Sequence, residues 1–163
     1  MKTRESSTGS ILILGYGNPG RQDDGLGPAF AESLGSLGRP GVSVDSNYQL
    51  NVEDAASVAR HDRVLFVDAC RQGEAPFVIS GVSPVREIAF TTHAVSPRAV
   101  LALCEDCFGA RPEAWVLGIR GYEFGVVEGL TRRARGNLEK ALGFVGELIG
   151  QWKEKEHGDG QRP

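Results

Sequence analysis

Residues 11–27 read ILILGYGNPGRQDDGLG, an apolar run that enters a glycine-rich loop and then a pair of carboxylates. The continuously apolar run 11–14 is typical of a strand covered on both faces, as in a parallel sheet. Asp23 and Asp24 stand where the next helix is expected to begin. The glycines are typical of a nucleotide-binding turn, whereas the carboxylates have the wrong charge for holding a phosphate. The stretch therefore predicts an α/β protein and leaves the ligand of the loop open.

Further apolar runs predict strands that alternate with helices. Strands are expected at residues 11–14, 42–44, 64–67, 77–82 and 115–119. Helices are expected at 26–37, at 52–59 with Asn51 as N-cap, and at 97–107 with Ser96 as N-cap and Gly109 as the stop. An apolar stripe over residues 138–149 predicts a final helix, which is expected to end near Trp152. This alternation implies an α/β sandwich with a mostly parallel sheet.

The length and composition favour one globular domain. The chain has 163 residues, of which 40% are hydrophobic and 24% charged, enough for a core of its own. The domain is expected to cover residues 1–152, and the polar, glycine-containing segment 153–163 is expected to be a disordered tail. No apolar run approaches the roughly 20 residues that a membrane span needs.

The charge distribution excludes some partners. The formal net charge is −3, and basic residues occur only in short local clusters. A dominant role in binding nucleic acid or an anionic membrane surface is therefore not expected. Arg132, Arg133 and Arg135 are expected to form a solvated helix face, with docking of an acidic partner as the alternative.

The cysteines indicate a reducing compartment. The chain has three of them, Cys70, Cys104 and Cys107, and an odd, low count suits the cytoplasm better than a disulfide framework. Cys104 and Cys107 have the spacing of a metal or redox pair, but they lie within a helical pattern and no second cysteine pair accompanies them. We therefore expect both to be reduced and buried as small apolar side chains.

Three polar residues fall at strand ends or in the loops that follow. They are Asp24, Asp68 and His93, and sites in open α/β sheets form beyond the carboxyl ends of the strands. Asp68 directly follows four apolar strand residues, where a carboxylate is costly without a partner or a task. Two carboxylates and an imidazole on one rim predict a site for a divalent transition metal with open positions. The alternative is a structural role for each residue. Asp24 would stabilise the start of a helix through its charge, Asp68 would accept hydrogen bonds from loop amides, and His93 would have no ligand role.

The glycine-rich loop also allows a nucleotide-binding interpretation. Gly15, Gly17 and Gly20 match the dinucleotide pattern G-x-G-x-x-G, and Asp45 ends the next strand, where a ribose-binding acid would stand. Pro19 weakens this interpretation because it lacks the backbone N–H that a phosphate would need. A nucleotide-binding or regulatory module remains the alternative function.

Several separated motifs occur along the chain in a fixed order: Gly15-x-Gly17-Asn18, Asp23-Asp24-Gly25-x-Gly27, Val67-Asp68-Ala69, Thr92-His93 before Ser96-Pro97, Gly118-Ile119 and Glu128-Gly129-Leu130. In this order they resemble a known family, the hydrogenase maturation endopeptidases, which process the large subunit of nickel-iron hydrogenases. The resemblance covers about residues 11–149. Tyr48-Gln49-Leu50 with Glu53 is similar to the branch that serves soluble, cofactor-reducing hydrogenases.

The resemblance implies a fold and an unusual mechanism. The fold is a three-layer α/β/α sandwich with a twisted, mostly parallel five-stranded sheet. Asp24, Asp68 and His93 would be the catalytic and nickel-contacting residues of a nickel-dependent endopeptidase. The nickel would be carried by the hydrogenase precursor, so the enzyme, expected to be a monomer, would read whether nickel has been inserted before removing the C-terminal extension. The chain shows no serine or cysteine nucleophile motif, which favours direct attack by water.

A second resemblance is weaker. Gly17-Asn18-Pro19-Gly20 after an apolar strand is similar to the opening of peptidyl-tRNA hydrolases. That family needs a histidine shortly after this motif, whereas Arg21, Gln22, Asp23 and Asp24 follow here. The chain also lacks a basic bias for tRNA.

Overall fold

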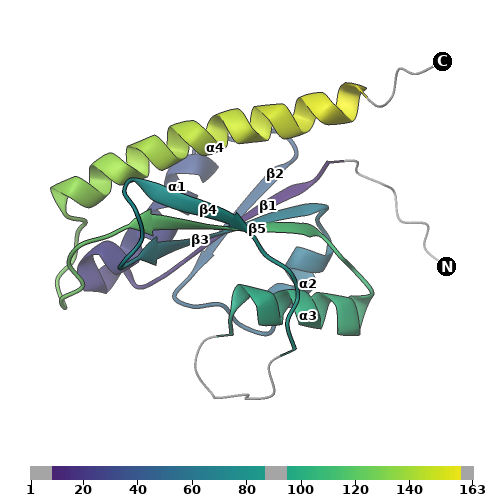
Figure 1. The fold of residues 1–163 in the computed structure, drawn as a ribbon, viewed down its shortest axis with the longest axis horizontal. Coiled ribbons are helices and arrows are strands. Elements are labelled where there is room, and N and C mark those ends of the chain that lie inside the picture. Colours follow the sequence, from purple (N-terminus) through teal and green to yellow (C-terminus); the bar gives the residue numbers. More distant parts are fainter. Residues whose placement is uncertain (1–8, 87–94, 159–163) are drawn as a thin grey trace.

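Five strands form one twisted sheet in the order β2-β1-β3-β5-β4 (Figure 1). The computed structural model describes residues 9–86 and 95–158. The strands are β1 (Ile11–Tyr16), β2 (Val42–Asn47), β3 (Arg63–Cys70), β4 (Phe77–Gly81) and β5 (Glu113–Arg120). All pair in parallel except β4, which runs antiparallel to β5 at one edge. Every strand predicted from the sequence is confirmed, and the sheet is mostly parallel as expected.

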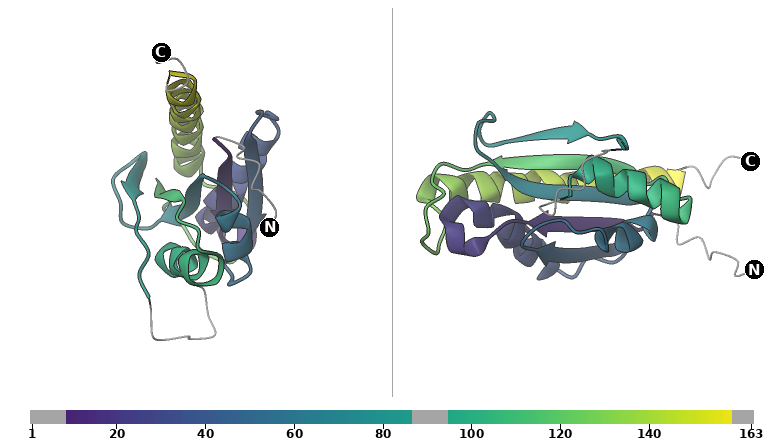
Figure 2. Two further views of the ribbon diagram at one scale, coloured as in Figure 1. Left: turned by 90° about the vertical axis from the view of Figure 1, so that its right-hand side faces the viewer. Right: turned by 90° about the horizontal axis from the view of Figure 1, so that it is seen from below.

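Helices cover both faces of the sheet, which confirms the three-layer architecture. One face carries α1 (Leu26–Gly35) and α4 (Arg132–Gly158), and the other carries α2 (Asp54–Ala59) and α3 (Pro97–Phe108). Figure 2 shows α4 and α3 on opposite sides of the sheet. A 3₁₀ segment, η1 (Pro19–Gly25), links β1 to α1. No helix in the described ranges combines the length and hydropathy that a membrane crossing requires.

The two cores explain why the first strand is apolar throughout. Ile11 and Ile13 pack under α1 and α4, whereas Leu12 and Leu14 pack against α2 and α3. All four side chains are at most 3% exposed. Alternate side chains of a strand point to opposite faces, so a strand buried on both sides needs apolar residues at every position.

Some helix ends differ from expectation, and two of them have a visible cause. The second helix begins at Asp54 rather than 52, because the Asp54 carboxylate accepts the Asn51 N–H (2.7 Å) and so closes a turn ahead of it. The last helix continues to Gly158, so residues 153–158 are helical and the predicted disorder is wrong there; residues 159–163 lie outside the described part. This extra turn is held by packing and charge: Trp152 stacks on Trp115, and Glu156 pairs with Arg63 of β3.

The cysteine prediction is confirmed for one residue and wrong for the other. None of the three cysteines forms a disulfide. Cys104 is fully buried and its Sγ lies 3.3 Å from the Ala55 carbonyl oxygen, whereas Cys107 is exposed. The partner helix α2 has six residues and α3 has twelve, which leaves the last turn of α3 uncovered.

Native-state alkylation should distinguish these two thiols. Burial raises the pKa of Cys104 to about 11, so its thiolate is scarce as well as shielded. Iodoacetamide is expected to modify Cys107 and spare Cys104 in the folded protein, as read by mass spectrometry of peptides. Cys104→Ala should cost about 1–2 kcal/mol of unfolding free energy, and Cys107→Ser less than about 0.5 kcal/mol. Rapid modification of Cys104 without unfolding would contradict this packing.

Candidate functional site

The site lies toward the carboxyl ends of the strands, where β1 ends beside β3. Gly15 of β1 is in register with Val67 of β3, so the next residues, Tyr16 and Asp68, are neighbours. Both belong to the alternation that faces α2 and α3, as Leu14 and Phe66 do one step earlier. The sequence placed Asp68 directly after its strand, but β3 continues to Cys70 because residues 68–70 pair with β5. Asp24 reaches the same end of the sheet from η1, the segment that follows β1.

Two glycines bring Asp24 to the strand ends. A Cβ on Gly27 would lie 2.3 Å from the Tyr16 carbonyl oxygen and 2.6 Å from that of Val67, so α1 can begin against the sheet only without a side chain there. Gly17 has a φ of 143°, and a Cβ on it would lie 2.0 Å from the Asp24 carbonyl oxygen. The glycines therefore serve close packing of η1 and α1 against the strands.

The loop amides are already used within the protein. Gly17 N donates to the Asn47 carbonyl, and Asn18 N to Asp24 Oδ2. Gly20 N donates to Asn18 Oδ1, and Arg21 N to the Asn18 carbonyl. A phosphate would find these donors engaged and a carboxylate among them, which argues against the nucleotide-binding interpretation.

Asp23 and Asp24 have different roles. The Asp23 side chain is fully buried and accepts hydrogen bonds from Tyr122 N (2.8 Å), Glu123 N (3.1 Å) and both the N and the Oγ1 of Thr131 (2.8 Å each). Desolvation alone would raise its pKa, but these four bonds together hold the pKa below its ordinary value. Asp23 thus anchors the loop 121–131, a structural role that sequence reasoning missed.

The backbone of η1 turns sharply before this pair. Gln22 has a φ of 51°, in the left-handed region that residues other than glycine rarely adopt. Its N–H donates to the Val127 carbonyl, and its Oε1 accepts the Gly125 N–H. The loop 121–131 therefore holds Gln22 in this conformation, and the turn directs Asp23 inward.

Asp24 and Asp68 keep carboxylate oxygens available. Asp24 Oδ2 accepts the Asn18 N–H, and Asp68 Oδ1 accepts the Ala69 N–H, each at 2.8 Å. Within the described part of the chain, the other oxygen of each has no hydrogen bond and neither forms an ion pair. Burial raises the pKa of Asp68 to about 6, and the charge of Asp24 adds to the rise. The negative charges of Asp24 and Asp68 repel each other, and a bound cation would reduce this repulsion.

Tyr16 is a further member of the site that sequence reasoning did not select. Burial first, and then the charge of Asp68, raise the pKa of the Tyr16 phenol. The phenol therefore stays protonated at neutral pH. The signal available in the sequence was its position at the end of the first strand, in alternation with Leu12 and Leu14.

The third predicted ligand, His93, lies outside the described residues, so its place stays a prediction. Among described residues, no three His, Cys, Asp or Glu side chains form a group that could hold a metal ion. His61 and His157 bond through Nδ1 to carbonyls of their own helical segments, Ser57 and Lys153. Of the three ligands predicted from the sequence, the structure therefore describes two, Asp24 and Asp68.

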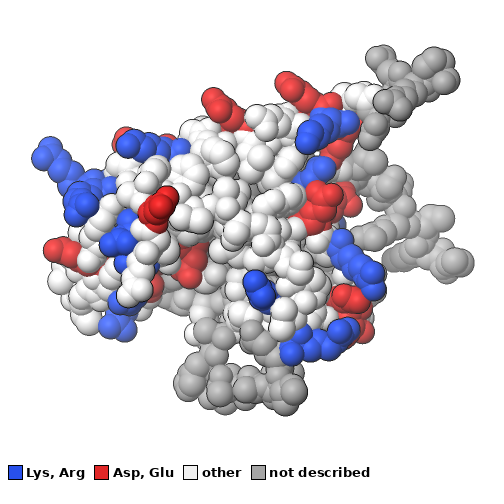
Figure 3. Space-filling view, viewed as in Figure 1, with Lys and Arg blue, Asp and Glu red and all other residues white. Residues whose placement is uncertain are grey.

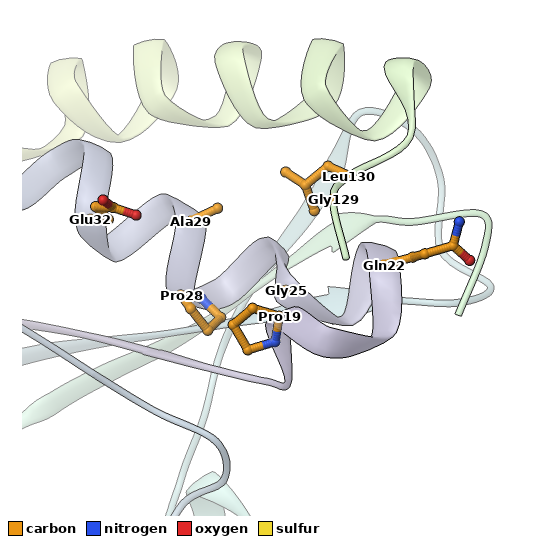
Figure 4. A pocket seen from close by; sticks show the side chains of 8 residues that line it. All are labelled: Pro19, Gln22, Gly25, Pro28, Ala29, Glu32, Gly129 and Leu130. Carbon is orange, nitrogen blue, oxygen red and sulfur yellow. The ribbon is translucent and has the colours of Figure 1, made fainter. Parts of the chain in front are cut away.

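Two small cavities flank the segment from Pro19 to Pro28. One, of about 150 Å³, is drawn in Figure 4 with Glu32 at one end and Gln22 at the other. The second, of about 170 Å³, lies on the other side of Pro19 and Pro28, next to exposed Tyr48. Sites for small molecules usually measure about 300–1,000 Å³, so each cavity suits a single side chain rather than a dinucleotide.

Comparison with known proteins places the fold. No family model matches the chain, and no curated protein matches its sequence. Solved structures do match. A [NiFe] hydrogenase maturation protease, HycI, from Thermococcus kodakarensis has a TM-score of 0.69 at 24% identity, over 89% of this chain and 95% of that one. The hydrogenase maturating endopeptidase HybD from E. coli has a TM-score of 0.69 at 23% identity, over 87% of this chain and 93% of that one. The chain has the fold of the hydrogenase maturation proteases.

A hydrogenase 2 maturation peptidase from a thaumarchaeon extends the same likeness. It has a TM-score of 0.65 at 21% identity, over 86% of this chain and 98% of that one. The match spans nearly the whole of each of these proteases. The fold expected from the sequence motifs is thereby confirmed.

Proposed function

We propose that this chain is an endopeptidase that removes the C-terminal extension of a nickel-iron hydrogenase large-subunit precursor after nickel insertion. The observation that carries the proposal is the pair Asp24 and Asp68 in a maturation-protease fold, two carboxylates that form no ion pair with a Lys or Arg among the described residues. Carboxylate and imidazole are suitable ligands for a nickel ion that has open positions. We assign nickel contact to Asp24, Asp68 and His93.

In this proposal the nickel is part of the substrate. A few protein ligands without thiolate make a weak resident site, but they suffice to recognise a metal that the precursor already holds. Docking of the loaded metal would bring the adjacent chain to the site. A water molecule then attacks the scissile carbonyl carbon and the C–N bond breaks. The carboxylates accept the proton of the water, and the leaving amine takes up a proton.

Nickel loading of the precursor should decide whether it is cut. The enzyme is expected to cleave loaded precursor at least about 100-fold faster than the same precursor prepared without nickel, the size of effect expected from losing one essential transition-state contact. Mass spectrometry of the released C-terminal peptide measures both rates. Purified enzyme should contain little nickel, and inhibitors of serine and cysteine proteases should have no effect.

Two further arms make this test decisive. Nickel added to the enzyme alone should not restore cleavage of unloaded precursor, because the metal must be seated in the substrate. Equal cleavage of both precursors would refute recognition of nickel even if the protease assignment survived. Failure to cleave either one, together with a thermal shift of the free protein on adding NAD or ATP, would favour the nucleotide-binding alternative.

A further inference from the structure

Arginines gather beside the site, where β5 ends and α4 begins. Arg120 is the last residue of β5, Arg71 directly follows β3, and Arg132, Arg133 and Arg135 lie in the first turn of α4. We call these residues the arginine cluster. Figure 3 shows Lys and Arg side chains at this end of the molecule, on the left of the view.

Aromatic rings of the loop 121–131 support the cluster. The guanidinium carbon of Arg133 lies 3.9 Å from the centroid of the Tyr122 ring, and that of Arg71 lies 4.0 Å from the centroid of Phe124. Arg120 also lies over Tyr122, at 5.2 Å. Stacking holds the face of a guanidinium and leaves the N–H groups along its edge free to bind.

The aromatic support is itself fixed to the site. Tyr122 OH accepts a hydrogen bond from Asn137 Nδ2 (3.0 Å), and the Tyr122 N–H donates to Asp23. Since Asp23 directly precedes Asp24, the cluster and the carboxylate pair share one framework. The β3–β5 register pairs Asp68 with Gly118 and Cys70 with Arg120, so Arg120 stands two residues beyond Asp68 along the sheet, roughly 7 Å.

The charges of the cluster are not neutralised within the described part of the chain. Ion pairs there involve Arg63, Arg86 and Arg111, and none involves the cluster. Arg120 Nη1 donates to the Gly73 carbonyl (2.9 Å), while its Nε is buried with no partner. Arginines in the first turn of a helix also face the positive end of its dipole, which is unfavourable by a few tenths of a kcal/mol each. An anion bound to the exposed arginines of α4 would offset this dipole cost.

We infer that the arginine cluster is the docking surface for an acidic stretch of the polypeptide substrate, an inference that rests on the proposed function. The planar fork of arginine matches a carboxylate with two parallel hydrogen bonds. The formal net charge of −3 disfavours a nucleic acid, because an extended polyanion would meet repulsion beyond the cluster, whereas a short acidic segment of a polypeptide would contact the cluster alone. Docking here would hold the precursor while its nickel meets Asp24 and Asp68.

The test reverses two exposed charges of the cluster. In the double variant Arg71→Glu/Arg133→Glu, the KM for nickel-loaded precursor is expected to rise about tenfold or more with kcat within about twofold, because the contacts are remote from the reacting bond. The KM of the wild type should rise with salt and that of the variant should not. Arg60→Glu is the matched control: Arg60 is exposed at the opposite edge of the sheet, just before β3, and should leave KM unchanged.

A second probe separates this inference from the proposed function. If the wild type cleaves loaded precursor and the double variant has the same KM, docking at the cluster is overturned and the proposed function stands. If the wild type cleaves no precursor, the proposed function fails, and a fluorescent oligoglutamate peptide tests the cluster alone. Fluorescence anisotropy measures the affinity for this peptide. A lower affinity of the double variant than of Arg60→Glu supports the cluster as a docking surface for acidic peptides, and equal affinities overturn this inference. Tighter, cluster-dependent binding of oligothymidylate would overturn it in favour of nucleic acid.

Discussion

Asp68→Asn is expected to lower the rate of precursor processing at least about 100-fold while leaving the fold intact. The amide keeps the shape of the side chain and can still accept the Ala69 N–H, but it removes the negative charge that we assign to nickel contact. Processing is measured by the release of the C-terminal peptide from loaded precursor. Asp106→Asn is the matched control, because that carboxylate is exposed on α3 and pairs with Arg86.

The same variant should be more stable than the wild type at neutral pH. Burial and Asp24 raise the pKa of Asp68 from 3.8 to about 6, so the folded protein binds the proton more tightly than the unfolded chain. Stability of the wild type therefore falls as pH rises from about 4 to about 6, and above this window the cost is about 3 kcal/mol. Asparagine does not titrate, so Asp68→Asn escapes this cost.

Urea denaturation across this pH window checks the sign. The advantage of Asp68→Asn over the wild type should be small at about pH 4, grow up to about pH 6 and then level off. A variant that is less stable than the wild type at neutral pH would show that Asp68 is a structural anchor rather than a strained functional group. Wild-type processing by this variant would remove Asp68 from the site altogether.

The sequence predicted the sheet well because burial on both faces leaves a local pattern. The runs 11–14 and 64–67 are apolar at every position, and the structure covers both faces of each. The end of the apolar run 64–67 pointed to Asp68, although β3 itself continues to Cys70 through its pairing with β5. What the pattern did not specify was the length of the last helix. Its final turn depends on Glu156 meeting Arg63, 93 positions away in the chain.

The glycine-rich loop shows why a motif can indicate two functions. A turn that lets a phosphate approach backbone amides and a turn that lets a helix approach a strand both require glycine. Here the space at Gly17 and Gly27 is taken by backbone, and the loop amides donate within the protein. The two possibilities differ in where those amides point, which local sequence does not determine.

The roles of Asp23 and Asp24 also could not be separated from the sequence. The two residues are adjacent, have the same side chain and stand in the same 3₁₀ segment. Their difference comes from partners distant in the chain. Tyr122 and Thr131 donate hydrogen bonds to Asp23 and not to Asp24, and they lie 99 and 108 residues further along the chain. Only the folded topology brings that loop against η1.

Asp23→Ala is therefore expected to be the most destabilising substitution in this segment. It leaves the N–H groups of Tyr122, Glu123 and Thr131 without their acceptor in a partly buried place, at about 1–3 kcal/mol for each group left unsatisfied. Allowing for relaxation of the loop, we expect a loss of about 3–5 kcal/mol in unfolding free energy, a large part of the stability of a typical domain. Denaturant unfolding measures this loss.

Asp24→Ala is the internal control for this prediction. It removes one hydrogen bond, from Asn18 N, and should cost only about 1 kcal/mol while abolishing processing. Hydrogen exchange should show amides 122, 123 and 131 losing protection in Asp23→Ala and keeping it in Asp24→Ala.

The pKa of Asp23 is lowered on folding, so the stabilisation that Asp23 provides is present at neutral pH and is lost as pH falls through that lowered value. The stability gap between the wild type and Asp23→Asn should then narrow in acid. Two results would show that the loop 121–131 is held by something other than Asp23. One is an Asp23→Asn variant nearly as stable as the wild type at neutral pH, and the other is an equal loss of unfolding free energy in Asp23→Ala and Asp24→Ala.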